Sequence, residues 1–142
     1  MAYDRMDWHY GTEDFPNELN DDNAGTHIGM FLAWAIQKDL IGELHLQESA
    51  ESISKVKSRQ ITGTDFLKLE CDQKFWEEDL NNKGNQFAKY YYESNDYYDD
   101  YSSILSDKLP SIFHVVDSWE NYDKLASKLD EQFQKWQIKV QS

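Results

Sequence analysis

The sequence contains one cysteine, two prolines and no long hydrophobic run. The single thiol, Cys71, excludes an internal disulfide framework and is typical of a reducing compartment. The longest apolar run, from Met30 to Ile36, has seven residues, whereas about 20 are needed to span a bilayer. The N-terminus also lacks the basic and apolar segments of a secretory signal. We therefore expect a cytoplasmic protein that does not enter a membrane.

Basic residues are scarce as well, because 14 lysines and arginines stand against 27 acidic residues, for a net charge of -13. The acids are concentrated in two stretches: residues 1–22 hold seven acids against one arginine, and residues 65–100 hold ten acids against four lysines. A field of this sign repels nucleic acid and anionic membranes and attracts a basic partner. The composition therefore predicts a basic protein partner and a chain that is monomeric when free.

Motifs that carry catalytic chemistry are missing. There is no glycine-rich phosphate loop, no G-x-S-x-G and no C-x-x-C. The four histidines, His9, His27, His45 and His114, show no metal-ligand spacing, and Cys71 lies far from them in the sequence. Cys71 is expected to be a small core residue. The sequence therefore predicts no enzyme activity, no cofactor and no metal.

What the sequence does contain is 15% aromatic residues, more than a disordered acidic chain carries, and a helical pattern over most of its length. The helix over 26–41 is apolar nearly all round, which is typical of a buried central helix, and Gly29 allows close backbone packing there. We expect one all-α domain over 1–142, with an ordered extended arm over 1–25 and a helical body over 26–142. The expected helices number about five to six: 26–41, 46–59, a capped helix from Thr62 to about 71, 82–94, 96–106 and 118–137. Residues 72–81 are expected to be irregular or a short turn, and residues 112–116 an extended buried connector, with a short strand as the alternative.

Polar and aromatic residues of the arm form the first candidate site. They are Asp7, His9, Tyr10 and Asp14, and His27 follows at the start of the central helix. A histidine at a helix N-terminus is disfavoured as a cation, so a neutral His27 is expected. These side chains either pin the arm to the core or form a ligand or catalytic pocket, and the sequence leaves both interpretations open.

Tyrosines among the acids of residues 65–100 form the second candidate site. Tyr90, Tyr91 and Tyr92 lie about 100° apart on a helix, so they cannot all face one core stripe. Tyr97 and Tyr98 repeat the pattern, and at least one or two of the five are expected at the surface. Either the hydroxyls of these tyrosines simply reach the surface from a small core, or the exposed rings and the neighbouring carboxylates dock a cationic protein. The predicted contact residues are Tyr92, Glu93, Asp96, Tyr98, Asp99, Asp100, Glu77, Glu78 and Asp79.

Three segments of the chain resemble an uncharacterised bacterial domain family. They are Asp7-Trp8-His9-Tyr10-Gly11 with Asp14-Phe15-Pro16, then the run from Gly25 to Ala35, then the run from His114 to Asp123. The resemblance implies a bacterial source and no particular activity. Small acidic proteins of this kind resemble immunity proteins of toxin systems. We therefore expect an immunity-type inhibitor that occludes a basic toxin domain acting on nucleic acid, with a small enzyme or ligand-binding domain at the arm as the alternative.

Overall fold

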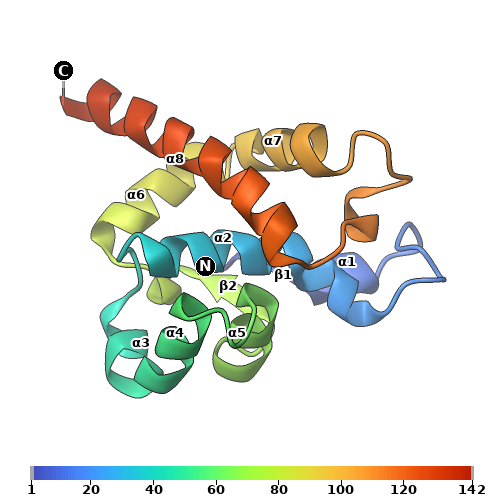
Figure 1. Ribbon diagram of the computed structural model, residues 1–142, viewed down its shortest axis with the longest axis horizontal. Coiled ribbons are helices and arrows are strands. Elements are labelled where there is room, and N and C mark those ends of the chain that lie inside the picture. The colour runs from blue at the N-terminus through green and yellow to red at the C-terminus, as the bar shows by residue number, and fades with distance from the viewer. Residues whose placement is uncertain (1, 142) are drawn as a thin grey trace.

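The computed structural model describes residues 2–141, and over that range the fold is mainly α-helical. Helix α2 (Thr26–Gln37) runs through the middle of the molecule (Figure 1). Below it in Figure 1 lie α3 (Glu43–Glu48), α4 (Ala50–Lys57) and α5 (Gly63–Glu70). Above it lie α6 (Asn82–Tyr91), α7 (Asp96–Leu105) and the long α8 (Trp119–Gln141). The predicted all-α class is confirmed, with one small sheet added.

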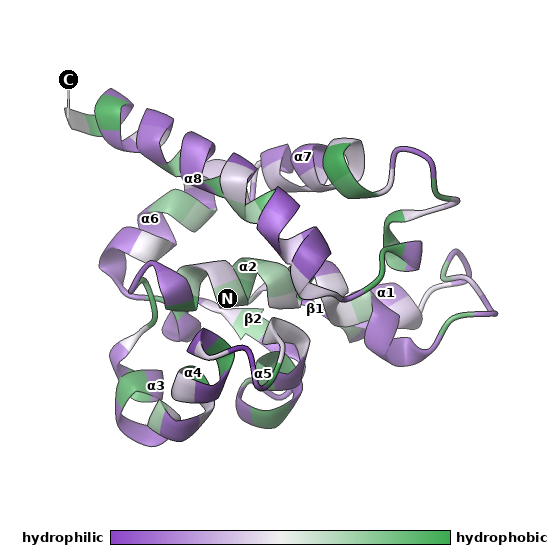
Figure 2. Cartoon of the chain, viewed as in Figure 1, coloured by the Kyte–Doolittle hydropathy of each residue, from purple (hydrophilic) through white to green (hydrophobic). Residues whose placement is uncertain are grey.

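Helix α2 is enclosed on every side, as its sequence predicts. All its residues from Thr26 to Ile36 are buried, and its ribbon is mostly pale to green on the hydropathy scale, whereas the outer helices alternate with purple (Figure 2). Trp34 joins it to α8: the indole Nε1 donates to Asp130 Oδ1 at 2.9 Å, and the ring packs edge-on against Phe133. The helix ends at Gln37 rather than 41, because Asp39 takes a left-handed conformation with φ of 59°.

Helices α2 and α5 cross at two glycines. A Cβ on Gly63 would lie 1.8 Å from the carbonyl oxygen of Gly29, and a Cβ on Gly29 would lie 2.4 Å from the backbone nitrogen of Thr64. The predicted capped start of α5 is confirmed, since Thr62 and Asp65 form a reciprocal capping box. These contacts fix the position of α2, whose N-terminus carries His27.

The N-terminal arm is only partly extended, which corrects the prediction for residues 1–25. It contains strand β1 (Ala2–Arg5), the single helical turn α1 (Asp7–Tyr10) and the 3₁₀ helix η1 (Asp21–Gly25). Strand β1 pairs antiparallel with β2 (Lys74–Trp76), with Asp4 opposite Phe75. The arm is therefore built into the body of the domain through β2, which lies in the segment 72–81 predicted to be irregular or a short turn.

Three further elements differ from the prediction. The expected helix over 46–59 is two helices, α3 and α4, that meet at Ser49. With α1 this raises the number of α-helices to eight in the described residues. The 3₁₀ helix η2 (Glu77–Asp79) follows β2, and η3 (Ile112–His114) replaces the expected connector. None of the helices described is at once long enough and apolar enough to cross a bilayer.

Candidate functional site

Two histidines and a tyrosine converge on one buried carboxylate, Asp4. Strand β1 carries Asp4, the α1 turn carries His9, and the first turn of α2 carries His27. The Nε2 atom of His9 lies 2.7 Å from Asp4 Oδ1, and the Nε2 atom of His27 lies 3.1 Å from Asp4 Oδ2. The hydroxyl of Tyr92 donates to Asp4 Oδ2 at 2.5 Å. We call Asp4, His9, His27 and Tyr92 the Asp4 cluster.

The carboxylate at the centre of the cluster is only 7% exposed and accepts hydrogen bonds on both oxygens. The backbone nitrogen of Arg5 adds a fourth donor, 2.8 Å from Oδ1. Next to the cluster, the hydroxyl of Tyr97 donates to the carbonyl oxygen of His27 at 2.5 Å. A buried charge normally requires this degree of hydrogen bonding, because an unpaired one is costly to desolvate.

The protonation states follow from these contacts. Burial raises the pKa of Asp4, but the hydrogen bonds and charges of His27 and His9 outweigh it, so the pKa of Asp4 lies below its ordinary value. Burial raises the pKa of Tyr92 well above its ordinary value, and the neighbouring charge of Asp4 raises it further. Asp4 is therefore an ionised acceptor and Tyr92 a protonated donor at neutral pH.

A pocket of about 270 Å³ opens over the Asp4 cluster. Its floor is the cluster itself, and its mouth carries two half-exposed aromatic side chains, Trp8 and Tyr98, which are 50% and 49% exposed. The lining comes from β1, α1, α2 and the segment 92–98, so four separate parts of the chain build it. The lining residues are Tyr3, Asp4, Trp8, His9, His27, Tyr92, Glu93, Asn95, Tyr97 and Tyr98.

The tyrosine-rich segment supplies one side of this pocket. Glu93 and Tyr98 lie at the mouth, and Asp96 and Asp99 are exposed in the first turn of α7. Tyr92 was predicted to contact a partner, but that assignment is wrong, because its side chain is 8% exposed and its hydroxyl is held by Asp4.

The other acids predicted at the partner surface either lie away from this pocket or bind other residues of the protein. Asp100 is half-buried and accepts from the hydroxyl of Tyr91 and from Gln132. Glu78 is exposed, and Glu77 is half-buried and ion-paired with Lys89 at 3.6 Å. The prediction for Asp79 is wrong, because this carboxylate is buried.

The candidate arm residues divide into two groups. His9 and His27 meet in the pocket, which agrees with the alternative that these residues form a pocket. Asp7 is exposed and pairs with Arg5, while Tyr10 is half-buried with its hydroxyl 3.3 Å from Gln73. Asp14 is exposed. These three therefore do not line the pocket over the cluster.

A second polar cluster lies inside the core. The Nε2 atom of His45 is 2.7 Å from Asp79 Oδ1 and 3.7 Å from the sulfur of Cys71, and its Nδ1 atom is 3.2 Å from the hydroxyl of Ser49. All four side chains are buried. Burial, together with the charge of Asp79, raises the pKa of the Cys71 thiol, so Cys71 is a protonated core residue, as predicted, and a poor nucleophile.

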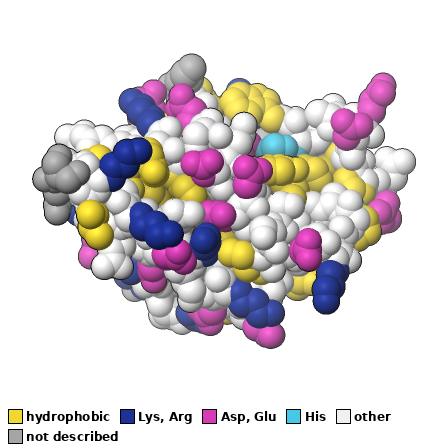
Figure 3. All heavy atoms as spheres, turned by 90° about the horizontal axis from the view of Figure 1, so that it is seen from above, with side chains coloured by type: hydrophobic (Ala, Val, Ile, Leu, Met, Phe, Trp, Pro, Cys, Tyr) yellow, Lys and Arg dark blue, Asp and Glu magenta, His cyan; other side chains and the backbone are white. Residues whose placement is uncertain are grey.

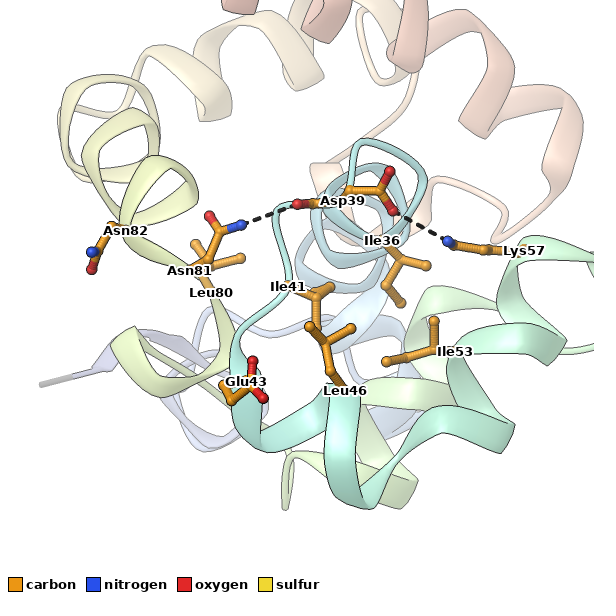
Figure 4. A pocket seen from close by; sticks show the side chains of 10 residues that line it. All are labelled: Ile36, Asp39, Ile41, Glu43, Leu46, Ile53, Lys57, Leu80, Asn81 and Asn82. Atoms are coloured by element: carbon orange, nitrogen blue, oxygen red, sulfur yellow. Dashed lines mark hydrogen bonds and ion pairs between the residues drawn. The ribbon is translucent and has the colours of Figure 1, made fainter.

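A larger pocket lies elsewhere, between the end of α2, helices α3 and α4, and the start of α6 (Figure 4). It measures about 520 Å³ and has an apolar wall that includes Ile36, Ile41 and Leu46. At its rim, Asp39 joins the two sides: its carboxylate pairs with Lys57 at 3.2 Å, and its carbonyl oxygen accepts from Asn81 at 3.0 Å. No histidine or tyrosine lines it, so it offers less chemistry than the pocket over the Asp4 cluster.

Asp4, the residue that organises the site, was not among the predicted site residues. It is one of seven acids among residues 1–22, and nothing in its immediate neighbours distinguishes it. Its burial depends on the pairing of β1 with a strand 70 residues later, which the sequence pattern did not reveal. A local signal is that Asp4 and His9 are only five positions apart, so that a strand followed by one helical turn brings their side chains together.

One of three comparisons with known proteins gives a match. No curated protein and no solved structure gives a significant match to the chain. Residues 2–115 match the model of a family described as a domain of unknown function (DUF7832). The matched range includes every member of the Asp4 cluster and ends after η3, before α8 begins. Since it covers most of the sequence, the chain belongs to the DUF7832 family.

Proposed function

We propose that this protein binds a basic protein partner at the mouth of the pocket over the Asp4 cluster. The observation that carries the proposal is the position of Trp8 and Tyr98, whose half-exposed rings line the same pocket beside Glu93. The arm and the tyrosine-rich segment, which the sequence offers as alternative sites, therefore contribute to one surface. Aromatic side chains at the centre of a contact and carboxylates around it are typical of hot-spot regions.

Charge supports a basic partner but does not by itself select the surface. The net charge of -13 attracts cations from all sides. On the face drawn in Figure 3, however, carboxylates lie singly among basic and hydrophobic side chains. Local recognition therefore requires the aromatic rings, on which a lysine or arginine of the partner stacks while Glu93, Asp96 and Asp99 neutralise its charge.

The biological role that fits such a surface is that of an immunity-type inhibitor in the cytoplasm. A toxin domain that acts on nucleic acid needs a basic cleft, and an acidic, aromatic surface occludes such a cleft by imitating the phosphate field. The protein itself is then a binding protein rather than an enzyme, and it is monomeric until it meets its partner.

The test is the binding kinetics with the product of the adjacent gene, measured at two salt concentrations. Trp8→Ala and Tyr98→Ala are each expected to raise the dissociation rate at least tenfold, because they remove anchors. Charge reversal of Asp96 and Asp99 to lysine is expected to slow association several-fold and to weaken its salt dependence.

Matched controls separate local recognition from overall charge. Tyr90→Ala removes an exposed tyrosine that lies outside the pocket. Reversal of Glu48 on α3 and Glu51 on α4 to lysine changes the net charge by the same amount as reversal of Asp96 and Asp99, but at a different surface. Both controls are expected to bind with nearly the dissociation rate of the wild type. Equal weakening by the controls, or the absence of any complex, would contradict the proposal.

A further inference from the structure

Three atoms of the kinds that bind first-row metal ions converge on the floor of the pocket. A carboxylate oxygen of Asp4, one ring nitrogen of His9 and one ring nitrogen of His27 all lie within 4.8 Å of one another. The two imidazole rings meet edge to face, with centroids 4.8 Å apart and planes inclined at 76°. They do not stack on each other, and both direct the same nitrogen towards the same carboxylate.

The spacing of these atoms is close to that of ligands around one ion. Nitrogen and oxygen ligands lie about 2.0–2.2 Å from Zn²⁺, so two of them at a tetrahedral angle are about 3.3–3.5 Å apart. The two nitrogen-to-oxygen distances in the cluster are 2.7 and 3.1 Å. These distances end on different oxygens, Oδ1 and Oδ2, so the carboxylate and at least one imidazole must turn before one oxygen and both nitrogens share an ion.

We infer that Asp4, His9 and His27 form a binding site for a divalent transition-metal ion of the Zn²⁺ or Fe²⁺ class. Two histidines and one carboxylate are the ligand set of such ions when positions remain open for water or substrate. The pocket of about 270 Å³ above the cluster supplies room for those further ligands. The site goes beyond the proposed function and does not depend on it, because the partner surface is formed by side chains at the mouth.

Binding of the ion changes the positions of protons in a defined way. In the metal-free cluster each histidine donates its Nε2 proton to Asp4. Coordination uses the lone pair of Nε2, so a neutral histidine carries its proton on Nδ1 instead, and a charged histidine releases one proton. Two hydrogen bonds are thereby replaced by three metal–ligand bonds.

Tyr92 keeps its place as an outer partner of the site. Its hydroxyl donates to Oδ2 of Asp4, and it continues to orient the carboxylate when Oδ1 binds the ion. Such outer hydrogen bonds are typically worth 10- to 100-fold in metal affinity. Tyr92 is therefore a positioning residue of the site and does not itself coordinate the metal.

The second group of suitable residues, His45, Cys71 and Asp79, lacks these advantages. The carboxylates of Asp4 and Asp79 both accept on their two oxygens, but a pocket opens over Asp4, whereas His45, Cys71 and Asp79 line none of the pockets described above. All three side chains are enclosed in the core, and burial holds Cys71 as a thiol rather than the thiolate that metals require. The group of His45, Cys71 and Asp79 is better explained as a polar network whose hydrogen bonds are satisfied and which joins α3 to η2.

The experiment is a metal titration of the full-length protein after treatment with a chelator. Zn²⁺ binding is followed by calorimetry, and Co²⁺ binding by visible absorption, which reports the ligand geometry. We expect one ion per chain. His9→Ala, at a partly exposed position that tolerates truncation, is expected to lower the affinity at least 100-fold, and Tyr92→Phe by 10- to 100-fold.

The matched control is His114→Ala. This histidine also faces a carboxylate, with Nε2 3.0 Å from Glu18, but it has no second histidine beside it. Its variant is expected to bind the ion as the wild type does, and circular dichroism checks that each variant is folded. Absence of binding below millimolar metal, or unchanged binding by His9→Ala, would overturn the inference. Loss of metal binding in Cys71→Ser would instead assign the ion to the group of His45, Cys71 and Asp79, and would equally overturn the inference.

Discussion

At the scale of single residues, Asp4 holds together parts of the chain that are distant in sequence. Its carboxylate accepts hydrogen bonds from α1, from α2 and from the residue that follows α6. A hydrogen bond to a charged group contributes about 1.5–3 kcal/mol, more than a neutral one, because the ionised acceptor is otherwise poorly solvated. The cluster therefore stabilises the fold in addition to any ligand it binds.

The first prediction concerns the hydroxyl of Tyr92. Tyr92→Phe removes one donor to the buried carboxylate without creating a cavity, so the free energy of unfolding is expected to fall by about 1.5–3 kcal/mol. Urea denaturation followed by circular dichroism measures the loss. Tyr98→Phe, at a half-exposed position, is the control and is expected to change stability by less than about 0.5 kcal/mol. Equal stabilities of the two variants would show that the bond to Asp4 contributes nothing.

The site residues were only partly predictable, because burial and distant partners, rather than residue type alone, decide which of them form the site. His9 and His27 were found because histidine is rare and chemically distinctive in this sequence. Asp4 was not, because an acid among many acids becomes notable only when it is buried. Tyr92 was assigned to the surface, whereas the surface tyrosines are Tyr90 and Tyr98. The number of exposed tyrosines was correct, but the sequence does not reveal which faces of α6 and α7 the neighbouring helices cover.

At the scale of elements, long helices with strong patterns were predicted well and short elements were not. The buried α2 and the capped α5 follow from their own residues. Strand β2 has three residues, and its partner β1 lies near the N-terminus, about 70 residues earlier in the chain. The run from Ile112 to Val116 has the composition of a strand, yet Ser111 accepts a hydrogen bond from the nitrogen of Phe113 and starts a 3₁₀ turn. Among the described residues no strand pairs with this run, so the local cap decides its conformation.

The second prediction concerns the crossing of α2 and α5. In an isolated helix, replacing glycine with alanine is favourable by up to about 1 kcal/mol. In Gly63→Ala, however, the new Cβ collides with the carbonyl oxygen of Gly29 at 1.8 Å, and a backbone cannot yield as a side chain does. We expect the steric term to prevail and to destabilise the protein by about 3 kcal/mol. Thermal unfolding measures the effect.

The control for this variant is Glu51→Ala, which also raises helix propensity but at an exposed position of the adjacent α4. Its melting temperature is expected to stay within a few degrees of the wild type or to rise slightly. An equally stable Gly63→Ala protein would mean that α2 and α5 separate easily, and that the position of His27 is not fixed by their contact.

At the scale of the whole molecule, an acidic exterior surrounds a core rich in tyrosine. Tyr91, Tyr92, Tyr97, Tyr101 and Tyr122 are all buried, although the sequence stretch around the first three is strongly acidic. The tyrosine rings at the end of α6 and the start of α7 pack together, since the ring centroid of Tyr97 lies 5.9 Å from that of Tyr91 and 4.9 Å from that of Tyr92. Two elements that face each other thus enclose more tyrosines than one helix face would hold. A protein with this core is sensitive to any condition that ionises phenols.

The third prediction is therefore alkaline unfolding. Burial raises the pKa of Tyr3 from 10.0 to about 12, and burial also raises the pKa of Tyr91, Tyr92, Tyr97, Tyr101 and Tyr122. A group whose pKa is higher in the folded state contributes its full stability below its unfolded pKa, near 10, and loses it as the pH rises towards the folded value. We expect cooperative loss of helical circular dichroism between about pH 10 and 12, together with a rise of tyrosinate absorbance. Tyrosines that ionise near pH 10 while the helices remain intact would contradict the burial of the phenols.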